Sequence, residues 1–98
     1  MSLFELGAVL MTAEVARMVD EEDDAFVIVL DCLQRHSEGD WGDLCEEDRR
    51  MNDEAIEAER DGGETDRLFS AYETGLGTLY FITEWDRSTT TVLTPEDY

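Results

Sequence analysis

The sequence predicts a single acidic α+β domain over residues 1–98, with a three- to four-stranded antiparallel sheet and two to three helices packed on one face. Two observations lead to this fold class. Apolar residues follow helical spacing in the segments before residue 60, and they alternate with a period of two after residue 66. A chain of 98 residues of which 42% are hydrophobic also suits one core. The sheet is therefore expected to be a C-terminal β-meander covered by the preceding helices.

The N-terminal segment is expected to enter the fold as a strand and then turn into a helix. Residues 3–11 are mainly apolar and indicate a short strand or an extended segment. Thr12 is a suitable N-cap for a helix over residues 13–19, in which Val15 and Val19 stand four residues apart.

A run of five acids over residues 20–24 predicts an exposed loop that leads into a second helix. Its carboxylates suit the N-terminal end of a helix, where the helix dipole favours negative charge. Residues 25–36 are rich in strand-forming residues, but the segment is long and has helical spacing, which favours a helix. The apolar positions that fit this spacing are Phe26, Val29, Leu30 and Leu33.

The middle of the chain is expected to form a turn, a surface helix and a loop. Residues 37–43 contain two glycines and several capping residues, which are typical of a turn. Residues 45–60 predict a helix with few apolar positions, of which Met51 and Ala55 make one stripe, so most of this helix should face water. Residues 61–66 are expected to form a loop.

Three strands with tight turns are expected after residue 66, over residues 67–74, 78–85 and 88–94. In the middle strand the residues at 79, 81, 83 and 85 share one face, and Trp85 is expected to pack in the sheet. The last strand is expected to leave an exposed edge, which would allow a homodimer.

Charge is the strongest feature of the composition. The chain has 26 acidic residues against 7 basic ones, a formal net charge of −19, and every basic residue is an arginine. Residues 20–66 alone carry 19 acids and 4 arginines. A surface of this sign is steered toward positive partners, and it excludes direct binding to nucleic acid or to an anionic membrane.

The apolar segments and the two cysteines indicate the location of the protein and the redox state of its thiols. We identify neither an apolar run long enough to span a bilayer nor a secretory leader, so a cytoplasmic location is expected. In a reducing cytoplasm Cys32 and Cys45 are expected to be free thiols or ligands rather than a disulfide framework.

Several stretches together resemble a family of short bacterial proteins found on plasmids, prophages and integrative elements. Members are usually described as plasmid-related, and some carry the label of a restriction-modification subunit M. The stretches that carry the resemblance are GDWGDLCEED over 39–48, NDEA over 52–55, LFSAY over 68–72, YFITEWDRSTTTVL over 80–93 and PEDY over 95–98. The resemblance implies an accessory protein of a mobile genetic element.

The acidic stretches are the strongest functional candidates. The net charge of −19 has a linear density similar to that of the phosphates in one turn of B-DNA, so a DNA mimic that occupies a basic nucleic-acid-binding groove is expected. Trp41 is a candidate apolar anchor for the partner, with burial between the helices as the alternative. The acids are Asp20, Glu21, Glu22, Asp23, Asp24, Glu46, Glu47, Asp48, Asp53, Glu54 and Glu57.

This pattern predicts a non-enzymatic inhibitor of a host defence nuclease, of the anti-CRISPR or anti-restriction kind. Its partner would be a basic protein surface, and it would need no cofactor. Adaptation to high salt would also produce so acidic a surface, and so would a need for solubility alone. No catalytic residues are predicted, because crowded carboxylates on a surface helix lack the convergence that acid–base chemistry requires.

The alternative function is a small metal-binding regulatory or structural module. Cys32 and His36 stand four residues apart on one helix face, and Cys45 follows the turn, so the three side chains are a candidate zinc site. The competing interpretation is a buried Cys32, an incidental Cys45, and a charged His36 that complements the C-terminal end of its helix.

Overall fold

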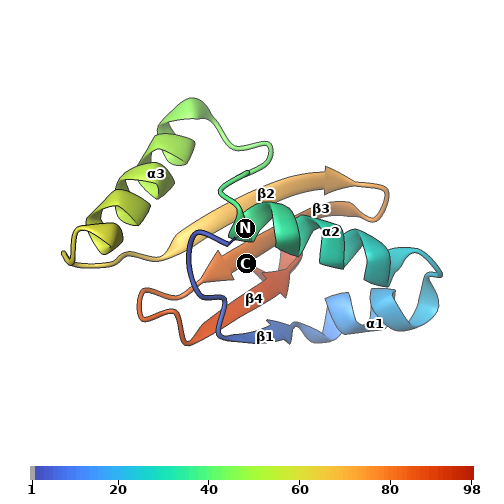
Figure 1. Ribbon diagram of the computed structural model, residues 1–98. Helices are drawn as coiled ribbons and strands as arrows, with labels where there is room; N and C mark the ends of the chain where they lie inside the picture. The colour runs from blue at the N-terminus through green and yellow to red at the C-terminus, as the bar shows by residue number, and fades with distance from the viewer. Residues whose placement is uncertain (1) are drawn as a thin grey trace.

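The computed structural model describes residues 2–98. It is an α+β structure, as the sequence predicts, with three helices packed against a four-stranded sheet (Figure 1). Thr12 caps the first helix by accepting a hydrogen bond from the Val15 amide. The elements, in chain order, are β1 (Ala8–Met11), α1 (Ala13–Glu21), α2 (Ala25–Ser37), α3 (Glu46–Arg60), β2 (Leu68–Thr74), β3 (Gly77–Thr83), β4 (Thr89–Leu93) and the 3-10 helix η1 (Pro95–Asp97).

The sheet is mixed, so the prediction of a purely antiparallel sheet is wrong in one strand. The order is β1-β4-β3-β2, and β2, β3 and β4 form the predicted antiparallel meander. Strand β1 runs parallel to β4, held by hydrogen bonds such as that from the Thr12 amide to the Val92 carbonyl at 3.1 Å. The prediction that the last strand is an open edge is also wrong, because β4 lies between β1 and β3.

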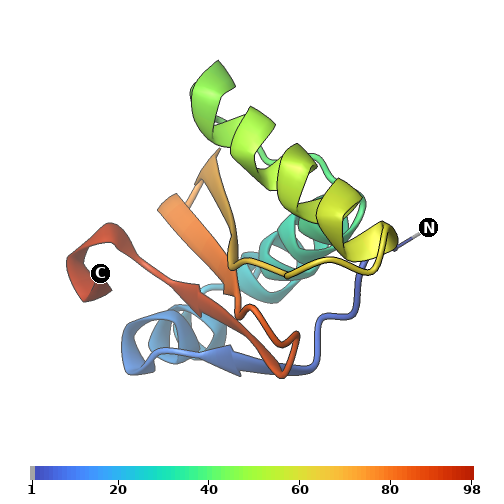
Figure 2. The same cartoon turned by 90° about the vertical axis from the view of Figure 1, so that its left-hand side faces the viewer.

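One face of the sheet forms the core. Helices α1 and α2 cover it with Val15 and Val29, which pack against residues of β2, β3 and β4. A second cluster joins α3 to the start of β2, where Ala55 and Ile56 pack with Leu68. Figure 2 shows α2 and α3 on the same side of β2 and β3, with η1 on the other side. The prediction of helices on one face is therefore correct.

The buried faces of α2 and α3 are rotated from those that the spacing of their apolar residues predicts. In α2 the buried apolar positions include Ala25, Val29 and Cys32, which turns Phe26 and Leu30 outward by about one residue's rotation of the helix. In α3, Ala55 of the predicted stripe is buried, but Met51 is exposed, because the helix turns positions 52 and 56 inward beside Ala55.

The opposite face of the sheet carries a cluster of aromatic rings. Phe69, Tyr80 and Tyr98 contact one another, with ring centroids 4.9 to 6.2 Å apart. Trp85 does not join the sheet as predicted. Strand β3 ends at Thr83, two residues earlier, and the chain turns there toward β4, which leaves Trp85 62% exposed.

The outer edge of β2 is closed by side chains and by a short segment of backbone. Asn52 donates to the Phe69 carbonyl at 2.7 Å and accepts from the Phe69 amide at 3.2 Å. The Trp41 carbonyl accepts from Ala71, and the Asp43 amide donates to the Ala71 carbonyl at 2.7 Å. This edge therefore has few free groups with which another strand could pair.

Exchanging the Asn52 amide for a carboxylate, Asn52→Asp, is expected to lower the free energy of unfolding by about 1–3 kcal/mol. The carboxylate cannot donate to the Phe69 carbonyl and places a charge at a buried position. Urea denaturation measures this difference. Asp48→Asn on the exposed part of the same helix is the matched control and should change stability little; an equal loss in both variants would contradict the role given to Asn52.

Candidate functional site

The predicted acidic residues lie in two groups at opposite ends of the molecule. The body measures 42 × 26 × 26 Å. Residues 20–24 form the end of α1 and the connection to α2, and residues 46–57 belong to α3; the two views place them far apart (Figures 1 and 2). All eleven predicted acids are exposed. They do not converge on one site but extend the negative charge along the long axis.

Most of these carboxylates have no partner among the residues that the structure describes. Glu21 pairs with Arg17, Glu54 lies 3.9 Å from Arg50, and Asp53 accepts a hydrogen bond from the Trp41 indole at 2.9 Å. Within residues 2–98 the other eight side chains make neither a hydrogen bond nor an ion pair. Their full charge is therefore presented to the surroundings, and the eight are Asp20, Glu22, Asp23, Asp24, Glu46, Glu47, Asp48 and Glu57.

Trp41 is not an exposed anchor. Its side chain is only 3% exposed and packs beside Phe4, with ring centroids 6.1 Å apart. The alternative prediction, that Trp41 fills the core where the helices meet, is the correct one. Its position follows from the bond to Asp53 and from the backbone bond to Ala71, which together hold the ring beneath α3.

The three candidate zinc ligands do not form a cluster. Cys32 is buried in α2, and Cys45 is exposed at the start of α3. In the described part of the chain, no group of three histidine, cysteine, aspartate or glutamate side chains is arranged to hold a metal ion. His36 is engaged elsewhere, because both of its ring nitrogens make hydrogen bonds to hydroxyl groups of the sheet.

His36 is the centre of a buried hydrogen-bond chain that crosses the sheet. Its Nδ1 meets the Ser70 hydroxyl, and its Nε2 lies 2.9 Å from the Thr83 hydroxyl. The Thr83 and Thr90 hydroxyls are 2.7 Å apart, and Thr90 donates to the Leu6 carbonyl at 2.7 Å. The imidazole is fully buried. The hydrogen bonds link α2 to three strands and to the N-terminal segment.

The direction of the hydrogen bonds from His36 to Leu6 determines that Nε2 of His36 carries a proton. The Leu6 carbonyl can only accept, so Thr90 donates to it, and Thr83 must then donate to Thr90. The Nε2 atom of His36 therefore carries a proton and donates to Thr83. In the neutral imidazole, Nδ1 then accepts from Ser70. Burial, helped by the charge of Arg87, lowers the pKa of His36 to about 4. The interpretation of His36 as a charged helix-terminal residue is therefore wrong.

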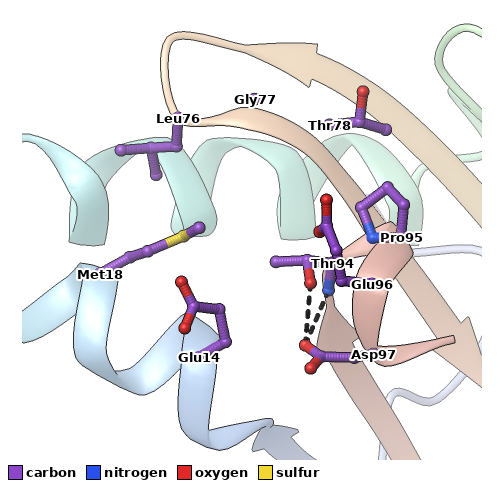
Figure 3. Close-up of a pocket in the computed structure, with 9 residues that line it drawn as sticks. All are labelled: Glu14, Met18, Leu76, Gly77, Thr78, Thr94, Pro95, Glu96 and Asp97. Carbon is purple, nitrogen blue, oxygen red and sulfur yellow. Dashed lines mark hydrogen bonds between the residues drawn. The ribbon is translucent and has the colours of Figure 1, made fainter.

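A hollow of about 550 Å³ lies between α1, the turn from β2 to β3, and η1 (Figure 3). Two of its three acids have partners within the protein. Asp97 accepts from Thr12 at 2.7 Å and from the Thr94 hydroxyl at 3.0 Å, and these bonds lower the pKa of Asp97. Glu14 pairs with Arg17. The bond from Thr12 to Asp97 thus joins the start of α1 to η1. Among the described residues, Glu96 is the one acid of the hollow that has no partner.

Across residues 2–98, the structure contains no helix that is both long enough and apolar enough to cross a membrane.

Comparison with known proteins gives no match by any of three routes: no family model, no curated protein and no solved structure is significantly similar to this chain.

Proposed function

We propose that this chain is a non-enzymatic acidic protein of a mobile genetic element that acts in the cytoplasm as an inhibitor of a host defence nuclease. It occupies the basic surface with which the nuclease binds nucleic acid, and it belongs to the anti-CRISPR or anti-restriction kind of protein. The link to a mobile element rests on the resemblance of roughly residues 33–98 to plasmid-related proteins.

The observation that carries the proposal is the distribution of charge along an elongated body. A net charge of −19 over a length of 42 Å is one negative charge per about 2.2 Å, against about one per 1.7 Å of B-DNA. The unpaired acids of 20–24 and of the first turn of α3 lie toward the two ends of this body, so a long basic groove would meet carboxylates along its length.

The seven arginines offset only part of this charge. Arg17, Arg35 and Arg67 each pair with a carboxylate of the same chain, and Arg87 is buried. Arg49, Arg50 and Arg60 are exposed on α3, where they offset part of the charge of its carboxylates. Such a surface gains from contact with a partner rich in lysine and arginine, and it is attracted at long range when salt is low.

The proposal is tested by displacement of labelled DNA from purified nuclease complexes, at about 0.1 M and about 0.5 M salt. The protein is expected to displace DNA from its target at the lower salt and to lose most of this effect at the higher. Failure to displace DNA from any complex of a panel covering CRISPR effectors and restriction enzymes, at either salt, would contradict the proposal.

A charge variant locates the contact. Neutralising Asp20, Glu22, Asp23 and Asp24 to their amides is expected to weaken binding by about 10-fold or more, if each lost pair is worth up to about 1 kcal/mol. The matched control neutralises four other acids that have no partner among residues 2–98, namely Glu5, Asp31, Glu64 and Glu96. Equal weakening in both variants would show that net charge alone, rather than this end of the molecule, determines binding.

A further inference from the structure

A groove of about 610 Å³ separates α3 from the aromatic face of the sheet. We call it the α3 groove. Its apolar wall comes from the start of α3, from β2 and from the C-terminal segment, and two carboxylates stand at its rim. The wall residues are Leu44, Met51, Phe69 and Tyr98, and the rim residues are Asp48 and Asp66.

The apolar wall is open to a partner. Met51 is 60% exposed and Tyr98 is 75% exposed, although both are large apolar or aromatic side chains. Tyr98 is held in place by its contacts with Phe69 and Tyr80, with ring centroids 6.2 and 5.7 Å away. The groove therefore presents a positioned aromatic ring and a thioether that the fold itself does not cover.

The free polar groups of the α3 groove are negative. Within residues 2–98, the Asp48 and Asp66 side chains have no hydrogen-bond or ion-pair partner. Arg67 also lines the groove, but its guanidinium is bound to Glu84 at 3.2 Å. Asn52 lies at the base and uses its amide on the Phe69 backbone.

We infer that the α3 groove receives an arginine side chain from the basic surface of the protein partner; this rests on the proposed function. The methylene stem of an arginine fits against Met51 and Leu44, and its planar guanidinium stacks on the Tyr98 ring. Asp48 and Asp66 then provide acceptors for its N–H groups. A second copy of this chain is a poor occupant, because each copy brings a net charge of −19.

Arginine is preferred over lysine at such a site. A guanidinium is planar, stacks on aromatic rings and donates along two directions at once, whereas an ammonium is compact and strongly hydrated. A partner that is held by long-range charge alone would bind equally well through arginine or lysine. A preference between the two cations thus separates a built site from general attraction.

The test is nuclear magnetic resonance titration of the isotope-labelled protein with the blocked dipeptide acetyl-Arg-Arg-amide, and separately with acetyl-Lys-Lys-amide, at about 0.15 M salt. We expect the largest shifts at Met51, at residues 66–69 and at Tyr98, with tighter binding of the arginine peptide. Tyr98→Ala is expected to weaken arginine binding by about 3- to 10-fold, the range of one cation–π contact, and Tyr98→Phe to retain it.

Phe26→Ala on α2 is the matched control, because it removes an aromatic ring that is 55% exposed and lies outside the groove. It should leave arginine binding unchanged. The inference is overturned if the shifts centre on residues 20–24, if the two peptides bind equally, if Tyr98→Ala has no effect, or if neither peptide binds. If the Tyr98→Ala variant still displaces DNA from a nuclease as well as the unchanged protein does, the proposed function is upheld and the role of the α3 groove is rejected.

Discussion

Replacing Arg87 by alanine is expected to lower the free energy of unfolding by about 3 kcal/mol, which is typical of removing one partner from a buried ion pair. Arg87 lies in the turn between β3 and β4, and its side chain is only 7% exposed. It donates to the Glu59 carboxylate at 2.9 and 3.1 Å, to the Asp66 carbonyl at 2.7 Å and to the Glu84 carbonyl at 3.0 Å. Its loss removes the donor to the Glu59 carboxylate and to the Asp66 carbonyl and frees the end of α3 from the sheet, whereas the Glu84 carbonyl still accepts from the backbone amide of residue 87.

Thermal or urea denaturation of Arg87→Ala measures this effect, and Arg67→Ala is its control. Arg67 also bridges to a carboxylate, but its side chain is 56% exposed, so its removal should cost less than about 1 kcal/mol. Arg87→Lys is expected to lie between the two, because an ammonium cannot serve three separate acceptors in the fork geometry of a guanidinium. Equal stability of Arg87→Ala and Arg67→Ala would disprove the structural role of Arg87.

The second large effect is a loss of stability in acid that depends on His36. The unfolded chain takes up a proton on this imidazole near pH 6.5, whereas the folded protein does so only near pH 4. Between these values the unfolded state binds more protons, so stability falls as the pH is lowered from 6.5 to 4. The loss reaches about 3 kcal/mol below pH 4 and is absent above pH 6.5.

The measurement compares the protein with His36→Gln over pH 4 to 7 by urea denaturation. The variant is less stable at pH 7, because one side-chain amide cannot span Ser70 and Thr83 as the imidazole does. Its disadvantage is expected to shrink steadily toward pH 4. The comparison cancels the protonation of the many surface acids, which is shared by both proteins; a difference that stays constant with pH would refute the neutral, buried His36.

Local patterns predicted the elements well and their partners less well. The alternation of apolar residues after residue 66 predicted β2, β3 and β4 and their antiparallel pairing, because short turns leave few other arrangements. The pairing of β1 with β4 has no local pattern, since it joins segments from opposite ends of the chain. Neither the sequence of β1 nor that of β4 shows by itself that the two strands pair in parallel.

Burial was the least predictable property of the candidate site. Trp41 and Trp85 are the same residue type with acidic neighbours, yet one is buried and the other exposed. The difference depends on tertiary contacts, namely the Asp53 acceptor above Trp41 and the early end of β3 before Trp85. The aromatic wall of the α3 groove was missed for the same reason, because Met51 and Tyr98 meet only in the folded protein.

The parallel pairing of β1 with β4 also determines when the protein can fold during its synthesis. Contacts such as Thr90 to Leu6 and Thr12 to Asp97 join residues 84 and 85 positions apart. In a nascent chain, β1 leaves the ribosome well before β4, the strand with which it pairs. The conformational entropy lost in closing so long a loop slows folding. Until β4 emerges, Val9, Leu10 and Met11 have no strand beside them, so the sheet is completed only after β4 has been translated.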